Sequence, residues 1–192
     1  KRPSIPESPK DVVDEETMAR AFVHLEKLKR HRDLALLAIL YDTGMRATEV
    51  AEARVENLDL DKGVLLIPRT KNREVRTVGL SPKTVRYLDR YLRQKRKEPD
   101  WLFNGPKGRL TRSGVYWAVR GVFEELGYPR VIGPHDLRHT SATHAVGHMS
   151  EAAMMTLYGW SDSAMPRHYA KGGLLRAALD EHRRSGPMAR LK

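Results

Sequence analysis

The 192-residue sequence contains no cysteine, which excludes disulfides, thiolate metal sites and cysteine nucleophiles. Its longest uninterrupted apolar stretch covers eight residues, 34–41, whereas a membrane-spanning helix needs about 20. The sequence also lacks the glycine-rich motifs G-x-x-x-x-G-K-[ST] and G-x-G-x-x-G, as well as the G-x-S-x-G motif of serine hydrolases. These absences favour a globular domain in a reducing compartment, and they leave ATP, NAD and serine-hydrolase chemistry without support.

The chain is strongly basic, with 35 Lys and Arg against 24 Asp and Glu, a formal net charge of +11 and a pI near 10.0. Hydrophobic residues make up 40% and charged residues 31%, which is ordinary for a globular protein of one domain. Such a charge favours a polyanionic partner, with nucleic acid as the first candidate. The alternative is a basic surface that serves solubility alone, and composition does not separate the two.

Apolar residues recur at helical spacing through most of the chain. Asp14, Ser81 and Ser150 stand where N-caps are expected, and Gly44 and Gly159 stand where helices end. The pattern predicts helices over 14–29, 32–43, 48–55, 82–96, from 111 or 113 to 126, 135–147, 151–158 and 174–184. The second of these is almost wholly apolar, so we expect it at the buried centre of the fold.

Two segments, 63–68 and 73–80, are instead rich in β-branched residues and flank a short polar stretch. They predict an antiparallel hairpin with Lys71 and Asn72 at its turn. Residues 100–103 form another short apolar run, which we interpret as a third strand, and 104–109 is expected to be a loop. The expected fold class is α+β, mostly α, with one small antiparallel sheet.

Four of the eight histidines fall in one helical segment, PHDLRHTSATHAVGH. His135 and Arg138 lie three residues apart and share a face of the helix, with His139 adjacent to both. Arginine offers paired donors to phosphate oxygens and histidine can shuttle a proton near neutral pH, so this face suits a phosphate. Two alternatives remain open, a solvated basic helix without chemistry and a zinc site using His135 and His139, with Asp136 where a metalloprotease has glutamate.

Other candidates lie where helices or strands turn. Arg46 directly follows the buried helix, and Glu49 could hold its guanidinium in place. Lys71 is a mobile point charge and a suitable general acid for a leaving oxygen. Tyr169 lies between basic residues just before a glycine pair, and tyrosine is an uncommon covalent nucleophile. Taken singly, each is also explained as a surface charge or a packing residue.

Together and in order, these segments resemble the catalytic domain of the tyrosine recombinases, the phage-integrase family. TGMRATEV resembles the family's first arginine box and RTKNREVRTVGL the hairpin that carries a lysine. HDLRHTSATH is similar to the family's most recognisable motif, H-x-L-R-H-[ST]-x-A-T-H, and LYGWSDSAMPRHY resembles its closing box. In that box the nucleophile follows the L-G-[HW] position by nine residues, and Tyr169 follows Trp160 by nine.

The resemblance implies a reaction and its residues. Tyr169 would attack a DNA phosphate to form a 3′-phosphotyrosyl intermediate, which permits strand exchange without metal or ATP. Arg46 and Arg138 would stabilise the transition-state charge, Lys71 would protonate the departing 5′-oxygen, and His135 would assist proton transfer. The residues implied as catalytic are Arg46, Lys71, His135, Arg138, Trp160 and Tyr169, with Glu49 and His139 in support.

Three residues depart from the commoner family pattern. Trp160 stands where most members have histidine, and it would donate a hydrogen bond to a phosphate oxygen through its indole nitrogen. Ser141 replaces a commoner aromatic residue, and Tyr158 replaces the usual leucine before Gly159. We expect no consequence of these last two replacements for the chemistry.

The resemblance also implies an architecture and partners. Residues 1–10, polar and rich in proline, are expected to be an interdomain linker, followed by the catalytic domain over 11–185 and a C-terminal tail over 186–192. The expected partner is double-stranded DNA, with no cofactor, no metal and no membrane. We expect a homotetramer on two DNA duplexes for the longer protein, a monomer for this chain alone, and a location in the bacterial cytoplasm.

Two rival functions use similar residues. A type IB topoisomerase-like enzyme shares the tyrosine chemistry but relaxes DNA, and the order of HDLRHT, L-G-W and tyrosine favours the recombinase. A DNA-binding protein that has lost the reaction predicts an eroded catalytic set, whereas all six positions hold competent residues. The zinc alternative predicts activity that a chelator abolishes.

Overall fold

The computed structural model describes residues 12–68, 75–94 and 100–161. Within these ranges the helices are α1 (Glu15–Lys27), α2 (His31–Thr43), α3 (Ala47–Ala51), a 3-10 turn η1 (Val55–Asn57), α4 (Pro82–Gln94), α5 (Arg112–Glu125), α6 (Pro134–Ala145) and α7 (Glu151–Tyr158). The strands are β1 (Leu58–Asp59), β2 (Val64–Ile67), β3 (Arg76–Gly79), β4 (Asn104–Gly105) and β5 (Gly108–Arg109). The mainly helical α+β fold predicted from the sequence is confirmed.

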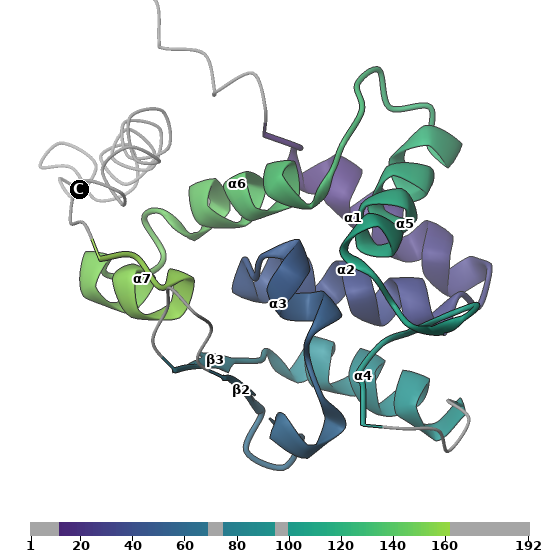
Figure 1. Ribbon diagram of the computed structural model, residues 1–192. Coiled ribbons are helices and arrows are strands. Elements are labelled where there is room, and N and C mark those ends of the chain that lie inside the picture. Colours follow the sequence, from purple (N-terminus) through teal and green to yellow (C-terminus); the bar gives the residue numbers. More distant parts are fainter. Residues whose placement is uncertain (1–11, 69–74, 95–99, 162–192) are drawn as a thin grey trace, which may run out of the picture.

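Helix α2 forms the centre of the fold, as predicted from its apolar sequence. It packs against α1, α4, α5 and α6, which surround it in Figure 1. The helix ends at Gly44, whose φ of +58° lies in the left-handed region that favours glycine. A Cβ at this position would also overlap the ring of Tyr158, so glycine is required both by the turn and by the close packing.

The predicted caps are confirmed. The carboxylate of Asp14 accepts the Thr17 N–H at 2.7 Å, and the hydroxyl of Ser150 accepts the Ala153 N–H at 3.2 Å. At α5 the cap is Thr111, the first of the two residues considered. Other boundaries differ by about two residues, since α1 ends at Lys27 and α6 ends at Ala145. The helix predicted over 48–55 is shorter than expected, because α3 ends at Ala51 and Val55 begins the 3-10 turn η1. The predicted helix over 174–184 lies outside the described residues.

Strands β1, β2 and β3 form a three-stranded antiparallel sheet. In the predicted hairpin Leu65 of β2 lies opposite Val78 of β3, and both side chains are buried against the helices. The turn with Lys71 and Asn72 lies outside the described residues.

The interpretation of 100–103 as a third strand of this sheet was wrong. The outer strand is β1, whereas Trp101 lies outside the sheet and forms an isolated bridge with Arg54. The 100–103 segment pairs with the loop after α3 instead, where the Leu102 N–H donates to the Ala53 carbonyl at 2.7 Å. Leu102 and Phe103 are buried in the helical core, where Phe103 stacks on Tyr91.

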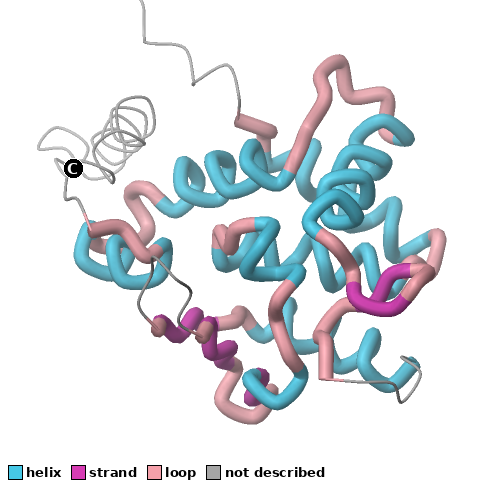
Figure 2. The backbone as a smooth tube through the Cα atoms, in the orientation of Figure 1, coloured by secondary structure: helices cyan, strands magenta, loops and turns pink. Residues whose placement is uncertain are grey.

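The expected loop over 104–109 contains the short hairpin of β4 and β5. The described residues therefore form two small sheets rather than the single one expected, at separate places in Figure 2. Gly108 permits this tight turn because its φ is +104°.

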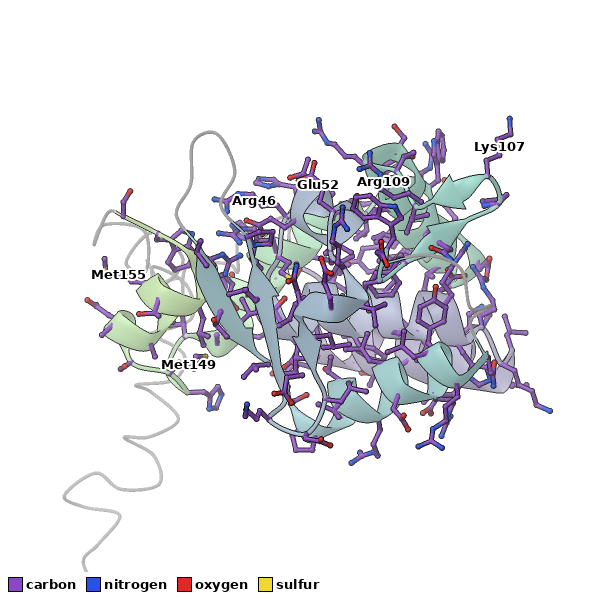
Figure 3. The ribbon with its side chains drawn as sticks, turned by 60° about the horizontal axis from the view of Figure 1, so that its bottom comes forward. Arg46, Glu52, Lys107, Arg109, Met149 and Met155 are labelled. Carbon is purple, nitrogen blue, oxygen red and sulfur yellow. The ribbon has the colours of Figure 1, made fainter. Side chains whose placement is uncertain are left out.

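The apolar interior is divided into two clusters. The larger surrounds α2, and the smaller joins the second half of α6 to α7 through the buried residues Ala142, Val146, Met154, Tyr158 and Trp160. Figure 3 shows Met149 and Met155 at this end of the molecule and Lys107 at the other. Helix α6 thus belongs to both clusters. No helix in the described part of the chain is long and apolar enough to cross a membrane.

Candidate functional site

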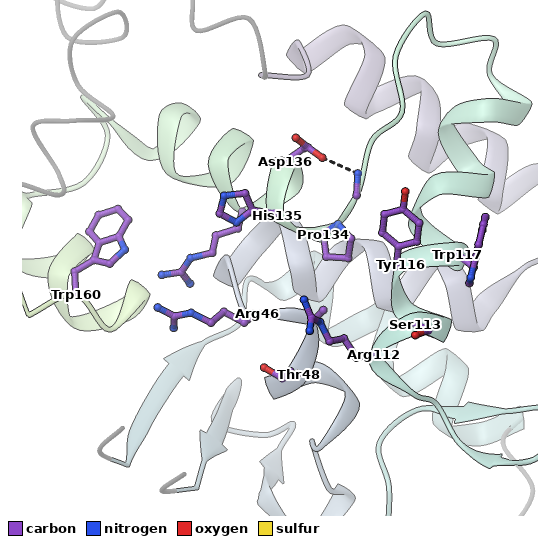
Figure 4. Close-up of a pocket in the computed structure, with 13 residues that line it drawn as sticks. Arg46, Thr48, Arg112, Ser113, Tyr116, Trp117, Pro134, His135, Asp136 and Trp160 are labelled. Carbon is purple, nitrogen blue, oxygen red and sulfur yellow. Dashed lines mark hydrogen bonds between the residues drawn. The ribbon is translucent and has the colours of Figure 1, made fainter. Parts of the chain in front are cut away.

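A pocket of about 740 Å³ opens where the N-terminal parts of α3, α5 and α6 meet Trp160, the second residue after α7 (Figure 4). Four of the six residues expected to be catalytic line it, namely Arg46, His135, Arg138 and Trp160. The fold thus brings together side chains up to 114 positions apart (160 − 46). Lys71 and Tyr169 lie outside the described residues.

Arg46 stands at the N-cap of α3, and its side chain extends into the pocket (Figure 4). The carboxylate of Glu49 accepts the backbone N–H of Arg46 at 2.8 Å and its guanidinium at 3.2 Å. The expected contact between the two residues is therefore present. Because one carboxylate both caps the helix and binds the guanidinium, the position of the arginine side chain is fixed relative to the helix.

Sequence reasoning missed a second arginine on Glu49. Arg76 of β3 donates to the Glu49 carboxylate at 2.9 Å and, through its other terminal nitrogen, to the Leu157 carbonyl at the end of α7. This residue ties α3, β3 and α7 together. The signal was present in the strand pattern, because Arg76 shares the inward side of the strand with the buried residues Val78 and Leu80.

Glu49 is almost completely buried, with only 4% of its side chain exposed. Burial alone would raise its pKa. The Arg46 backbone N–H and the guanidiniums of Arg76 and Arg46 outweigh burial, so the pKa lies below the ordinary value of 4.5. A carboxyl group whose pKa is lower in the folded than in the unfolded state stabilises the fold above the unfolded pKa, and this contribution is lost as the pH falls.

Replacing Glu49 with glutamine is therefore expected to destabilise the chain at pH 7 by about 3 kcal/mol, because two guanidiniums lose their charged partner. The stability of the parent should fall below about pH 4.5, and it should fall less in the variant, which has no carboxylate at position 49. Urea unfolding between pH 3 and pH 7 measures both effects. Glu124→Gln is the control, because Glu124 pairs with Arg120 on the exposed surface of α5. Parallel pH curves for Glu49→Gln and the parent would contradict the assignment.

Arg138 is buried, with 5% of the residue exposed. Its guanidinium donates to the carbonyl of Gly44, at the end of α2. It also donates to the carbonyl of Tyr158, the last residue of α7, at 2.7 Å. The carbonyls at helix C-termini carry partial negative charge and attract a cation. The alternative of a uniformly solvated basic helix is therefore wrong for α6, since its central cation is buried and held by two other helices.

The other polar residues of α6 have different surroundings. His135 is exposed at the rim of the pocket, and His139 is half-buried and is not among the residues that line it. Asp136 accepts the Gly133 N–H at 2.8 Å and so caps α6, as the dashed line in Figure 4 shows. Within the described residues, no three His, Cys, Asp or Glu side chains gather closely enough to hold a metal ion. The zinc alternative therefore lacks a third ligand in this part of the chain.

Trp160 forms the wall of the pocket that faces Arg46 in Figure 4. It follows Gly159, which ends α7 in the left-handed conformation with φ at +61°. The indole stacks on the ring of Tyr158, with 4.7 Å between ring centroids and 22° between planes. This stacking fixes the direction in which the indole faces the pocket.

Sequence reasoning also missed the part of the pocket that α5 forms. Arg112, Ser113, Tyr116 and Trp117 line this side, together with Thr48 of α3. Trp117 is 60% exposed, and the guanidinium of Arg120 lies 5.0 Å from its ring. These residues lie off the buried stripe of α5, so aromatic residues on the polar face of an amphipathic helix were the available signal.

The arrangement is suited to an anion. The guanidiniums of Arg46, Arg112 and Arg138, an imidazole and an indole border the same pocket, and each supplies N–H donors. Arg46 and Arg138 approach it from elements held by buried contacts, so little reorganisation is needed when charge develops on a bound group. A phosphate with two non-bridging oxygens matches this pair of guanidiniums.

Comparison with known proteins places these features in context. A model of the phage integrase family matches residues 11–172. The tyrosine recombinase XerD of Listeria innocua is 32% identical over 147 residues, which cover 72% of this chain and 49% of that protein. The chain spans about half the length of the curated relatives it matches.

Solved structures agree on the fold. The crystal structure of XerA recombinase superimposes with a TM-score of 0.80 at 23% identity, covering all of this chain and 67% of that one. A structure of the XerH site-specific recombinase bound to its difH substrate in a pre-cleavage complex gives a TM-score of 0.72 at 25% identity, covering 88% of this chain and 52% of that one.

Proposed function

The chain belongs to the phage integrase family of tyrosine recombinases, and from this we propose that it is the catalytic domain of a site-specific DNA recombinase. The observation that carries the proposal is the convergence of Arg46, His135, Arg138 and Trp160 on one pocket. These residues come from three separate family motifs, since His135 and Arg138 share one. Their meeting in one anion-binding pocket is what a phosphoryl-transfer site requires.

The proposed reaction transfers a DNA phosphate to the protein and back. The Tyr169 hydroxyl oxygen forms a bond to phosphorus while the bond to the 5′-oxygen breaks, leaving a 3′-phosphotyrosyl ester. His135 assists removal of the tyrosine proton, and Lys71 protonates the departing oxygen. Arg46 and Arg138 bind the two non-bridging oxygens, whose negative charge increases in the transition state. Attack of a 5′-hydroxyl from another strand reverses these steps and completes strand exchange.

The proposed partner is double-stranded DNA. Two supports are the net charge of +11 and the XerH neighbour, whose structure was solved with its difH substrate. We also propose that the longer protein acts as a homotetramer on two duplexes in the bacterial cytoplasm, with residues 1–10 linking this domain to another. Within that assembly, 11–185 would be the catalytic domain and 186–192 a tail.

Covalent trapping tests the proposal. The protein is incubated in EDTA with a labelled pool of nicked duplexes of randomised sequence, and the products are separated under denaturing conditions. We expect a labelled adduct, because cleavage close to the nick releases a short strand that carries the 5′-hydroxyl. Without that hydroxyl the phosphotyrosyl bond is not religated. Sequencing the trapped DNA should reveal a preferred site. Failure of the longer protein, with its linked domain, to form an adduct would favour a non-catalytic DNA-binding protein.

Plasmid relaxation separates the recombinase from the topoisomerase-like rival. A recombinase should leave a supercoiled plasmid without the preferred site unchanged. A type IB topoisomerase would relax it, because that activity requires no particular target. Relaxation of plasmids irrespective of sequence would therefore overturn the proposed function while leaving the tyrosine chemistry intact.

DNA affinity is expected to fall steeply with salt, because each Lys or Arg contact with a phosphate releases bound counterions. Figure 3 shows Arg46, Arg109 and Lys107 on the same side of the molecule. Replacing Arg109 or Lys107 with alanine should lower the slope of log K against log salt by about one each. Fluorescence anisotropy with a labelled duplex at several salt concentrations measures this slope.

The matched control is Arg93→Ala, because Arg93 is exposed on α4 and pairs with Asp89 one turn away. Helix α4 contributes no residue to the pocket lining. The slope of this variant should equal that of the parent. A flat salt dependence of the parent would show that the basic surface does not bind DNA phosphates.

A further inference from the structure

Tyr158, the last residue of α7, lies directly behind the pocket without lining it. Only 3% of the residue is exposed. Its ring stacks on the indole of Trp160, and the centre of the ring lies 5.4 Å from Cζ of Arg138. Its backbone carbonyl also accepts a hydrogen bond from the Arg138 guanidinium at 2.7 Å. Tyr158 therefore contacts two pocket residues through its ring and one of them through its backbone as well.

The phenol group of Tyr158 is hydrogen-bonded to a side chain of another helix. Its oxygen lies 2.6 Å from the hydroxyl oxygen of Ser141, on α6, and both residues are buried. A buried hydroxyl without a hydrogen bond costs free energy, so each of the two groups satisfies the other. Sequence reasoning treated Ser141 and Tyr158 as separate departures without consequence, whereas the structure shows that the two side chains are bonded.

The hydroxyl pair gives the ring a defined orientation. Gly44 packs closely against the ring, and there is no space for even a Cβ at that position. The ring is therefore confined between Gly44, Trp160 and the Ser141 hydroxyl. We propose that Tyr158, bonded to Ser141, is a positioning residue that sets the geometry of Arg138 and Trp160 for the phosphate. The consequence for catalysis rests on the proposed function, but the positioning itself does not.

The kinetic test measures the rate of adduct formation in single turnover, with duplexes recovered from the trapping experiment. Tyr158→Phe and Ser141→Ala should each slow the reaction about fivefold, because each removes the hydrogen bond that orients the ring. The double variant should be no slower than either single variant, since it removes both hydroxyls. DNA affinity should stay within about threefold of the parent, because the pair does not face the pocket directly.

A swap of side chains gives the stronger test. Tyr158→Leu removes the ring and should slow adduct formation about 100-fold, in the range found for a misplaced transition-state donor. Adding Ser141→Phe supplies a ring from α6 at a similar total volume, and the rate should recover to within about tenfold of the parent. Tyr87→Phe is the control. This substitution removes a hydrogen bond of 2.9 Å from the buried tyrosine of α4 to Glu26, at a position away from the pocket. The variant should therefore form the adduct at the parent rate.

A second measurement needs no DNA. The side-chain N–H resonance of Arg138, identified by its loss in Arg138→Lys, should be sharp in the parent, shifted or broadened in Tyr158→Leu, and restored by the swap. An unchanged resonance and an unchanged cleavage rate in Tyr158→Leu, with only a lower melting temperature, would overturn the proposal. If the longer protein forms no adduct while the resonance changes occur as expected, the proposed function is wrong and the positioning role stands.

Discussion

Replacing Tyr169 with phenylalanine is expected to reduce covalent adduct formation by more than about 10⁴-fold, as does removal of the nucleophile in other covalent enzymes. In the proposed reaction the phenol oxygen bonds to phosphorus, and phenylalanine offers no substitute. DNA affinity should change less than about threefold, because the basic surface and the pocket arginines remain. A denaturing gel of labelled DNA in EDTA measures the first effect, and anisotropy measures the second.

Tyr128→Phe is the matched control, because Tyr128 packs against Phe123 in the main core and does not line the pocket. It should form the adduct at the parent rate. An adduct that persists in Tyr169→Phe would mean that another residue is the nucleophile. The spacing of nine residues from Trp160, which selects Tyr169, would then be wrong for this chain.

The second large effect is expected at Arg138. Arg138→Ala should slow adduct formation about 10³-fold, because it removes a fixed donor to the phosphate oxygens in the transition state. It should also lower the melting temperature, because the carbonyls of Gly44 and Tyr158 lose a buried charged donor. Both effects arise from one guanidinium, which holds α2, α6 and α7 together while it faces the pocket.

Arg138→Lys separates the two roles. A single ammonium group keeps the charge but cannot reproduce the planar fork that reaches both carbonyls, so we expect partial recovery of stability and little recovery of rate. Arg46→Ala provides the comparison, because 29% of its side chain is exposed and the loss of stability should be smaller. Equal cleavage rates for Arg138→Lys and the parent would show that charge alone is sufficient at this position.

Much of the fold was predictable because its signals are local. Asp14, Thr111 and Ser150 cap helices by accepting N–H groups three residues away, and such contacts leave a readable pattern. Gly44 and Gly159 end helices in the left-handed conformation for the same local reason. The apolar run of α2 indicated burial on all sides, which the structure confirms.

The errors arose where pairing partners are distant. The 100–103 segment is apolar like a strand, but its backbone pairs with residues 53–55, almost 50 positions earlier. Periodicity describes how one segment alternates, and it does not state which other segment lies beside it. The helical core accepted Leu102 and Phe103, and β1 took the place at the edge of the sheet.

The sequence by itself determined the helical architecture, the family resemblance and the residues that carry the proposed chemistry, because caps, periodicity and motif spacing depend on neighbours along the chain. Only the tertiary structure decided how the site is held. Glu49 binds Arg76 as well as Arg46, Arg138 spans the ends of two helices, and Tyr158 bonds Ser141. Apart from the bond between Arg46 and Glu49, these contacts join residues 17 to 94 positions apart, as in the bonds of Ser141 to Tyr158 and of Arg138 to Gly44. Contacts of that kind follow from the packing of whole elements and leave no periodic trace in the sequence.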